Sequence, residues 1–123
     1  MKSILLVEYD RILAETYSIL LAKFFQIDIA KTAQEAVDIL DSKKINLIIT
    51  DTILGRHNGI EILHEVRSHQ DWLDVKFLIL SSLPQIDFPI VETDWANYGI
   101  EQFLYKPKTR PATLLFEANK ALL

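Results

Sequence analysis

Residues 46–51 of this chain read Asn-Leu-Ile-Ile-Thr-Asp, a short apolar run that ends at the carboxylate of Asp51. The run is too short for a buried helix and rich in β-branched residues, so it predicts a buried strand. The same pattern recurs in SILLV before Glu8, in FLIL before Ser81 and in QFLY before Lys106. If these strands are parallel, the four polar side chains meet at one edge of the sheet, where open α/β sheets bind ligands.

Helical periodicity fills the segments between these runs. Four sets of apolar residues recur three or four positions apart, which predicts amphipathic helices. The sets are Leu13, Tyr17, Leu20 and Phe24 within residues 11–25; Ala36, Val37 and Leu40; Ile60, Leu63 and Val66; and Leu114, Leu115, Ala118 and Leu122. Thr32 and Glu35 form a capping box before the second set. A further strand is expected at residues 27–30, and Pro89 could open a short helix that ends at Gly99.

Strands that alternate with helices predict the α/β class, with a parallel sheet covered on both faces. Right-handed crossovers favour a doubly wound, five-stranded sheet of order 2-1-3-4-5. In that order the switch point lies between the first and third strands, which end at Glu8 and Asp51. The length of 123 residues suits a single domain over residues 1–123.

Composition narrows the class of protein. The net charge of −4 and pI near 5.3 argue against a nucleic-acid surface, which requires a basic face. The chain has no cysteine, so it has no disulfide and no thiol nucleophile. No apolar run approaches the roughly 20 residues of a membrane span, and the amino-terminal segment turns charged too early for a signal peptide. We therefore expect a cytoplasmic protein with neither nucleic acid nor membrane as a direct partner.

The predicted edge holds the groups that phosphoryl transfer requires. Two carboxylates can bind a hard cation such as Mg²⁺, which keeps several waters, and a carboxylate can itself be phosphorylated. Ser81 could donate a hydrogen bond to a phosphoryl oxygen, and Lys106 could pair with another as a point charge. Positioning and charge stabilisation are most of what this reaction needs.

Over its whole length the chain resembles the receiver domain of two-component response regulators, which has a flavodoxin-like fold. The motifs that carry the resemblance are ILLVE at 4–8, LIITD at 47–51 with Gly59 eight residues beyond Asp51, LILSS at 78–82, and GIEQFLYKP at 99–107. The resemblance implies that Asp51 accepts a phosphoryl group from a histidine kinase or phosphotransfer protein. It further implies that Lys106 belongs to the site, that Ser81 is the switch hydroxyl and that Phe103 is the switch aromatic.

The resemblance also implies a cofactor and partners. Mg²⁺ would be held by Glu8, Asp51 and the backbone carbonyl of Ile53. The output would pass through the fourth helix, fifth strand and fifth helix to a downstream effector or an attached output domain, and that face could also form a homodimer. Such a domain is no enzyme in the usual sense, since it assists only its own phosphorylation and slow dephosphorylation.

The sequence departs from the family pattern where a second acid would follow Glu8. Tyr9 stands there, and a neutral phenol is a poor ligand for Mg²⁺. Mg²⁺ binding should therefore be weak. One alternative is a pseudo-receiver, a protein-interaction module that is not phosphorylated because Tyr9 replaces a metal-binding acid. Another is a small-ligand carrier of flavodoxin-like shape, although the chain has only three glycines and no glycine-rich phosphate loop.

Two apolar residues stand at positions where the family often has polar ones. Ile53 and Leu83 lie two residues beyond Asp51 and Ser81, and polar side chains there help to position hydrolytic water in relatives. Apolar residues at both positions predict a long-lived phosphoryl group. The segment from Ser81 to Gly99 is also long for the family, which predicts a short or displaced fourth helix.

Overall fold

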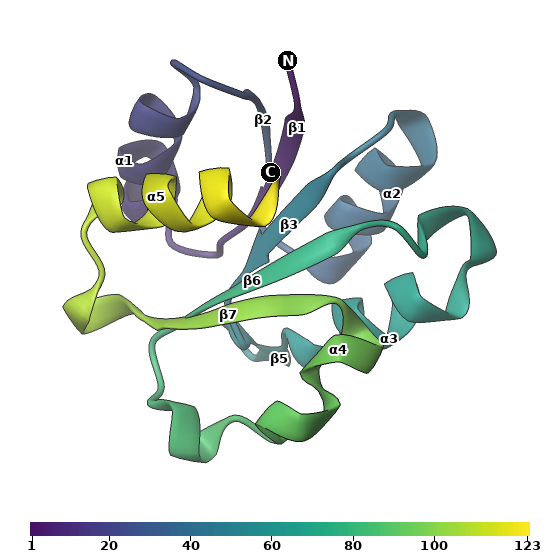
Figure 1. The fold of residues 1–123 in the computed structure, drawn as a ribbon. Helices are drawn as coiled ribbons and strands as arrows, with labels where there is room; N and C mark the ends of the chain where they lie inside the picture. Colours follow the sequence, from purple (N-terminus) through teal and green to yellow (C-terminus); the bar gives the residue numbers. More distant parts are fainter.

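Five of the apolar stretches form one parallel sheet in the computed structural model, which describes residues 1–123 (Figure 1). Its strands are β1 (Ser3–Val7), β2 (Gln26–Ala30), β3 (Leu47–Thr50), β6 (Lys76–Ser81) and β7 (Ile100–Tyr105). Their order is β2-β1-β3-β6-β7, and every neighbouring pair is parallel. Counted within this sheet alone, the order is 2-1-3-4-5, which confirms the predicted doubly wound topology.

Two layers of helices enclose the sheet (Figure 1). Helices α1 (Arg11–Leu21) and α5 (Pro111–Ala121) lie side by side on one face. Helices α2 (Ala33–Ser42), α3 (Ile60–Ser68) and the four-residue α4 (Trp95–Tyr98) cover the other. None of the helices has the length and apolar character needed to cross a bilayer.

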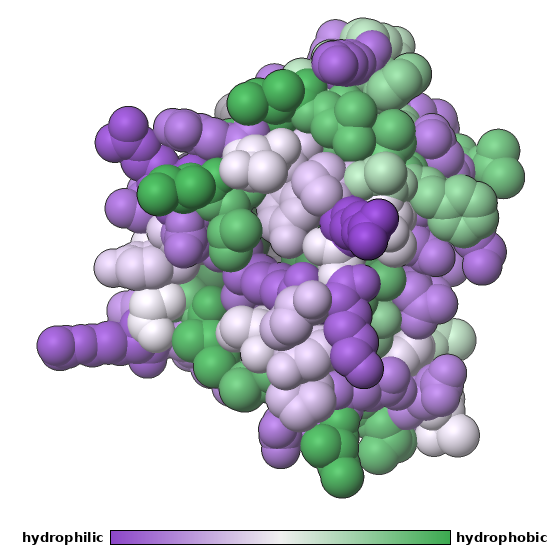
Figure 2. Space-filling model, turned by 90° about the vertical axis from the view of Figure 1, so that its left-hand side faces the viewer, coloured by the Kyte–Doolittle hydropathy of each residue, from purple (hydrophilic) through white to green (hydrophobic).

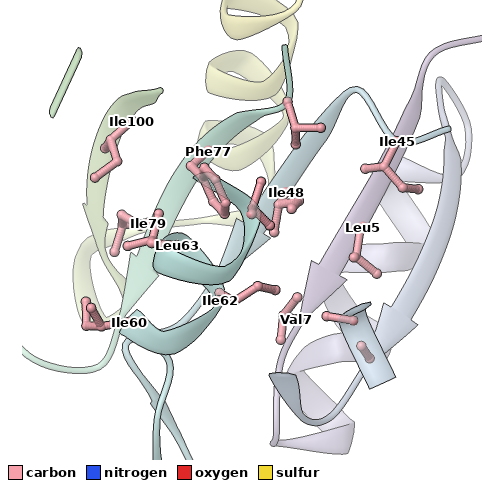
Figure 3. Close-up of a cluster of buried hydrophobic side chains, with 14 of the residues drawn as sticks. Leu5, Val7, Ile45, Ile48, Ile60, Ile62, Leu63, Phe77, Ile79 and Ile100 are labelled. Carbon is pink, nitrogen blue, oxygen red and sulfur yellow. The ribbon is translucent and has the colours of Figure 1, made fainter. Parts of the chain in front are cut away.

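Successive strand residues point to opposite faces, so each central strand feeds two cores. In β1, Ile4 and Leu6 pack with α1 and α5, whereas Leu5 and Val7 pack on the side of α2 and α3. Figure 3 shows the core on the side of α2 and α3, with Phe77 near its middle. Strands that are buried on both faces must be apolar at every position, which is why their sequences are continuous apolar runs.

Side-chain caps fix where the first two helices begin. The Asp10 carboxylate accepts the backbone N–H groups of Ile12 and Leu13 at the start of α1. The Thr32 hydroxyl accepts the N–H of Glu35 at the start of α2, as predicted. The Glu35 carboxylate reaches back to the N–H of Lys31, one residue before the cap rather than to the cap itself.

Two helices differ in detail from the expected pattern. Helix α1 ends at Leu21, and a turn leads into β2, so Phe25 is buried while Phe24 is 53% exposed. The apolar spacing predicts that Phe24 faces inward only if the helix continues to residue 25, and α1 ends four residues earlier. In α5 the buried face consists of Leu114, Ala118 and Ala121, and Leu122 is only partly buried.

The connection from β6 to β7 is mostly irregular. It contains two 3-10 turns, η2 (Gln85–Asp87) and η3 (Glu92–Asp94), followed by α4. The short helix therefore starts at Trp95 instead of near Pro89, and it ends at Gly99, whose φ of 73° is left-handed. Strand β7 starts at Ile100, two residues before the apolar run QFLY, because its ladder with β6 continues to Phe77.

Three short elements lie in the remaining connections. A two-stranded hairpin, β4 (Ile53–Leu54) with β5 (His57–Asn58), occupies the loop after β3. The 3-10 turns η1 (Gln70–Trp72) and η4 (Lys106–Lys108) follow α3 and β7. The sequence does not predict this hairpin, since two-residue strands have no detectable periodicity.

Candidate functional site

The carboxyl ends of β1, β3, β6 and β7 bring Glu8, Asp51, Ser81 and Lys106 to one edge of the sheet. Glu8, Asp51 and Ser81 are 2%, 4% and 1% exposed. The Lys106 Nζ lies 2.6 Å from Asp51 Oδ2 and also contacts Glu8 Oε1. The structure therefore gathers all four residues that the sequence predicted to meet.

Lys106 is the cation shared by both carboxylates. It follows β7 directly and opens η4, which places its side chain over the ends of β1 and β3. Burial alone would lower the pKa of Lys106, but its hydrogen bonds to Asp51 and Glu8 outweigh that effect and raise the pKa above the usual lysine value. The ammonium is therefore charged at neutral pH.

Asp51 is held in place by the loop that follows it. Its Oδ1 accepts the backbone N–H of Thr52 at 2.6 Å and that of Ile53 at 3.2 Å, so Oδ2 is left to face Lys106. The loop folds back on itself, and the Gly59 N–H donates to the Thr52 carbonyl at 2.7 Å. A Cβ at Gly59 would lie 2.1 Å from the Asp51 carbonyl oxygen, so this close approach requires glycine.

Thr52 is a site residue that the sequence did not single out. Its side chain is buried, and its Oγ1 lies 2.9 Å from the Ser81 Oγ and 3.4 Å from Asp51 Oδ1. The Ser81 Oγ also accepts the N–H of Leu83 at 3.0 Å. A threonine in a loop after a strand carries no distinctive signal, although its place directly after Asp51 could have suggested proximity.

The loop after β1 is arranged differently. Glu8 Oε2 accepts the Asp10 N–H at 3.0 Å, while the Asp10 carboxylate is engaged at the start of α1. Tyr9 is half-exposed, and its ring packs against Gly55 with the Lys31 ammonium 5.2 Å from the ring centroid. No third carboxylate therefore joins Glu8 and Asp51.

The sequence model of the response regulator receiver domain matches residues 4–116. The chain belongs to this family. Transcriptional regulatory protein MalR of Bacillus subtilis is 32% identical over 110 residues, which cover 87% of this chain and 45% of MalR. Response regulator MprA of Mycolicibacterium vanbaalenii is 26% identical over 105 residues, which cover 85% of this chain and 43% of MprA. This receiver domain thus spans less than half the length of these two relatives.

Solved receiver structures share the fold. A response regulator from Thermotoga maritima aligns with a TM-score of 0.81 at 24% identity, over 99% of this chain and 98% of its own. The regulator TrrA of the same organism, in complex with Mg²⁺-BeF, gives a TM-score of 0.76 at 24% identity over 100% of both chains. Chemotaxis response regulator CheY4 of Vibrio cholerae gives 0.82 at 20% identity over 98% of each chain. At these identities the likeness shows the fold alone.

Phosphorylation and Mg²⁺ are general features of receiver domains, so the donor set matters here. No group of three His, Cys, Asp or Glu side chains lies close enough to hold an ion. Mg²⁺ is nevertheless often held by one or two carboxylates plus water and phosphate oxygens, which Glu8 and Asp51 can supply. Each of their four oxygens already accepts a hydrogen bond from the protein. Glu8 and Asp51 therefore form a donor set that fits Mg²⁺, with water and phosphate oxygens as the remaining ligands.

Phe103 lies apart from the charged groups. It is 8% exposed, and its ring centroid is 5.4 Å from that of Phe88, which in turn lies 6.4 Å from that of Trp95. The β6–β7 connection, although irregular, thus supplies aromatic side chains that cover Phe103. Phe88 was another residue that sequence reasoning missed, because it lies just after η2 in an irregular segment that has no periodicity.

Ile53 and Leu83 are partly exposed apolar residues that lie near Thr52. They are 40% and 39% exposed, and both line a groove of about 390 Å³ between the β4–β5 hairpin and the start of the β6–β7 connection, together with Thr52. Figure 2 views the molecule from the side where β7 ends; hydrophobic residues there form separate groups around more hydrophilic ones. Ile53 and Leu83 therefore share a groove with Thr52, and their effect on water near Asp51 stays a prediction.

Tyr17 is a buried phenol close to the site. It is 4% exposed and packs between α1 and the sheet. Burial raises the pKa of Tyr17; among the nearby charges, Lys106 lowers it while Glu8 and Asp51 raise it. The phenol therefore lies within electrostatic range of the three charged groups, although the sequence marked it only as a core position.

Proposed function

We propose that this receiver domain accepts a phosphoryl group on Asp51 from a histidine kinase or phosphotransfer protein. The observation that carries the proposal is the pairing of Asp51 Oδ2 with the Lys106 ammonium at a buried sheet edge. The oxygen is fixed in direction because Oδ1 is held by two backbone N–H groups. A cation beside the attacking oxygen also offsets the charge of the incoming phosphoryl group.

In the proposed reaction, Asp51 Oδ2 attacks phosphorus as the bond from phosphorus to the donor's imidazole nitrogen breaks. The imidazole leaves with the electron pair of that bond and takes up a proton from solvent. Lys106 turns toward a phosphoryl oxygen, and Ser81 donates its hydroxyl hydrogen bond to another. Mg²⁺, weakly bound by Glu8, Asp51 and the Ile53 carbonyl, would neutralise part of the phosphoryl charge. The domain assists this reaction and slow dephosphorylation of itself, and it acts on no other substrate.

The output of the switch would be a change in the face formed by α4, β7 and α5. Phosphorylation would favour a state in which Ser81 and Phe103 move together and re-shape this face. A downstream effector or an attached output domain would read that face, and a homodimer could form through it. These partners are those of cytoplasmic signalling, and neither nucleic acid nor membrane is among them.

A second candidate function is the pseudo-receiver, in which the domain binds partners without being phosphorylated. The orientation of Tyr9 favours it, since the ring packs outward on Gly55 and contributes no metal ligand. The engagement of Asp10 at the start of α1 also favours it, because no nearby acid replaces the missing one.

Intact-mass measurement after incubation with a small phosphodonor and Mg²⁺ distinguishes the two functions. The phosphoacceptor proposal expects one phosphoryl adduct on the wild type and none on Asp51→Asn. The adduct should be removed by hydroxylamine, as expected of an acyl phosphate. If the wild type forms no adduct even in high Mg²⁺, the pseudo-receiver is correct, and partner capture is the next experiment.

A further inference from the structure

The Thr52 side chain occupies the space between the acceptor carboxylate and the switch hydroxyl. Thr52 is 8% exposed, and its Oγ1 reaches both Ser81 Oγ, at 2.9 Å, and Asp51 Oδ1, at 3.4 Å. Ser81 is even more deeply buried, at 1% exposure. The two hydroxyls therefore interact away from water, where a hydrogen bond has a strong influence on geometry.

Either hydroxyl can be the donor in the contact between Thr52 and Ser81. The Ser81 Oγ also accepts the N–H of Leu83 at 3.0 Å. When Thr52 donates to Ser81, the Ser81 oxygen accepts both hydrogen bonds, and its own hydroxyl hydrogen stays free for a phosphoryl oxygen. The Thr52 side chain thus fixes the position of the Ser81 oxygen beside Asp51.

We propose that Thr52 is a positioning residue that holds the Ser81 hydroxyl ready for the phosphoryl group. The inference rests on the proposed function and concerns the regulation of the same site. The switch hydroxyl need not be recruited from a distant position, because it already lies one hydroxyl away from Asp51. Phe103 is also already buried, beneath Phe88. Part of the conformational change that phosphorylation would have to drive is therefore complete in the unmodified domain.

The test measures the affinity of the wild type and of Thr52→Val for beryllofluoride, a phosphoryl mimic, by calorimetry in saturating Mg²⁺. Valine keeps the shape of threonine and removes the hydroxyl. The affinity for beryllofluoride should fall by about fivefold, which lies within the range expected for the loss of one neutral hydrogen bond. Thr52→Ser, which restores a hydroxyl, should recover most of it. Thr52→Ala removes the same hydroxyl and gives the same comparison should valine disturb the packing.

Thr50→Val is the matched control. Thr50 is a buried threonine two residues away, and its hydroxyl donates only to the Asp51 backbone carbonyl, at 3.0 Å. Urea unfolding should show a loss of stability for this variant, while its affinity for beryllofluoride stays near that of the wild type. Equal affinity losses in Thr50→Val and Thr52→Val would mean that Thr52 acts through general stability, and would overturn the inference.

A double-mutant cycle with Ser81→Ala separates positioning from direct contact. If Thr52 acts through Ser81, Thr52→Val should have no further effect on affinity once Ser81 is alanine. A full additional loss in that background would overturn the positioning role, as would an unchanged affinity in Thr52→Val alone. A wild type that binds no beryllofluoride and forms no phosphoryl adduct would overturn the proposed function and this inference together. A wild type that forms the adduct while Thr52→Val matches it in affinity would overturn this inference alone.

Discussion

The loops after β1 and β3 begin alike and end differently. Each starts with a buried carboxylate, Glu8 or Asp51, and both carboxylates share the ammonium of Lys106. After Asp51, two backbone N–H groups and the Thr52 hydroxyl turn inward to the carboxylate. After Glu8, only one N–H does so, while the next two side chains turn away, toward Gly55 and the start of α1.

This difference separates two tasks that one edge of the sheet would have to perform. The β3 loop orders an oxygen and its surroundings, which suits transfer of a phosphoryl group to Asp51. The β1 loop contributes a single carboxylate to a cation, which suits only weak metal binding. The shared lysine connects the two loops, so changes on either side can be measured against it.

The largest effect should follow from removing that lysine. Lys106→Met leaves two buried carboxylates facing each other without a cation, and we expect the free energy of unfolding to fall by about 3 kcal/mol. Urea unfolding at neutral pH measures it, with the exposed Lys108→Met as the control. In the Lys106→Met variant, adding Glu8→Gln should restore more stability than adding Asp51→Asn. The reason is that the Asp51 carboxylate still accepts more hydrogen bonds from the protein than the Glu8 carboxylate does. Equal recovery would mean that the two loops do not differ in their dependence on Lys106.

The difference in stability between the wild type and Lys106→Met should depend on pH in a defined way. The pKa of Lys106 is raised above its ordinary value of 10.5 because hydrogen bonds to Asp51 and Glu8 outweigh burial. A raised folded-state pKa gives a stabilisation that is complete below the unfolded value and is lost as pH rises through the folded value. The stability difference between wild type and Lys106→Met should therefore be constant from neutral pH to about pH 10 and shrink at higher pH. A difference that shrinks already near neutral pH would contradict this.

Restoring an acid to the β1 loop should have the next largest effect. Tyr9→Asp adds a third carboxylate beside Glu8 and Asp51, and Mg²⁺ affinity should rise about tenfold, since affinity increases with ligand charge. Calorimetric titration with Mg²⁺ measures it. Tyr9→Asn removes the ring without adding charge and should give no comparable gain. If both variants gain equally, the ring had blocked the site, and the missing charge was not the cause.

Asp10 should contribute to stability and not to metal binding. Its carboxylate accepts two N–H groups of α1, so Asp10→Ala should lower the free energy of unfolding by about 1 kcal/mol. Asp10→Ser keeps a capping oxygen and should recover most of that loss. Mg²⁺ affinity should be the same in all three proteins. A drop in Mg²⁺ affinity in Asp10→Ala would show that Asp10 replaces the acid missing at Tyr9.

The strand order and the meeting of Glu8, Asp51, Ser81 and Lys106 could be predicted because both follow from strong local signals. Fully buried strands require continuous apolar runs, and parallel strands bring their last residues to one edge. The residues at which helices and strands begin and end were harder to predict. Whether Phe24 or Phe25 is buried depends on where α1 stops, and that is decided by the turn into β2 rather than by apolar spacing.

The directions in which loop side chains point also could not be predicted from the sequence. Thr52 and Tyr9 each follow a buried acid, yet one turns into the site and the other away from it. The difference arises from contacts that are distant in the chain, Ser81 for Thr52 and Gly55 for Tyr9. The aromatic cover that Phe88 places on Phe103 is equally non-local. Residue spacing cannot report such contacts, because they depend on the packed positions of separate elements.

The smallest expected effect concerns two apolar side chains near the site, Ile53 in the loop after β3 and Leu83 in the connection after β6. Ile53 and Leu83 line one groove together with Thr52, the residue that follows Asp51. We expect hydrolytic water to approach a phosphoryl group on Asp51 from this groove. Ile53→Asn with Leu83→Glu would supply polar groups that orient such a water, and the phosphoryl lifetime should shorten about threefold. Time-resolved intact mass after removal of the phosphodonor measures it. Leu73→Glu places the same charge at an exposed site after α3 and should leave the lifetime unchanged. An equal lifetime in the double variant and the wild type would mean that factors other than these side chains limit hydrolysis.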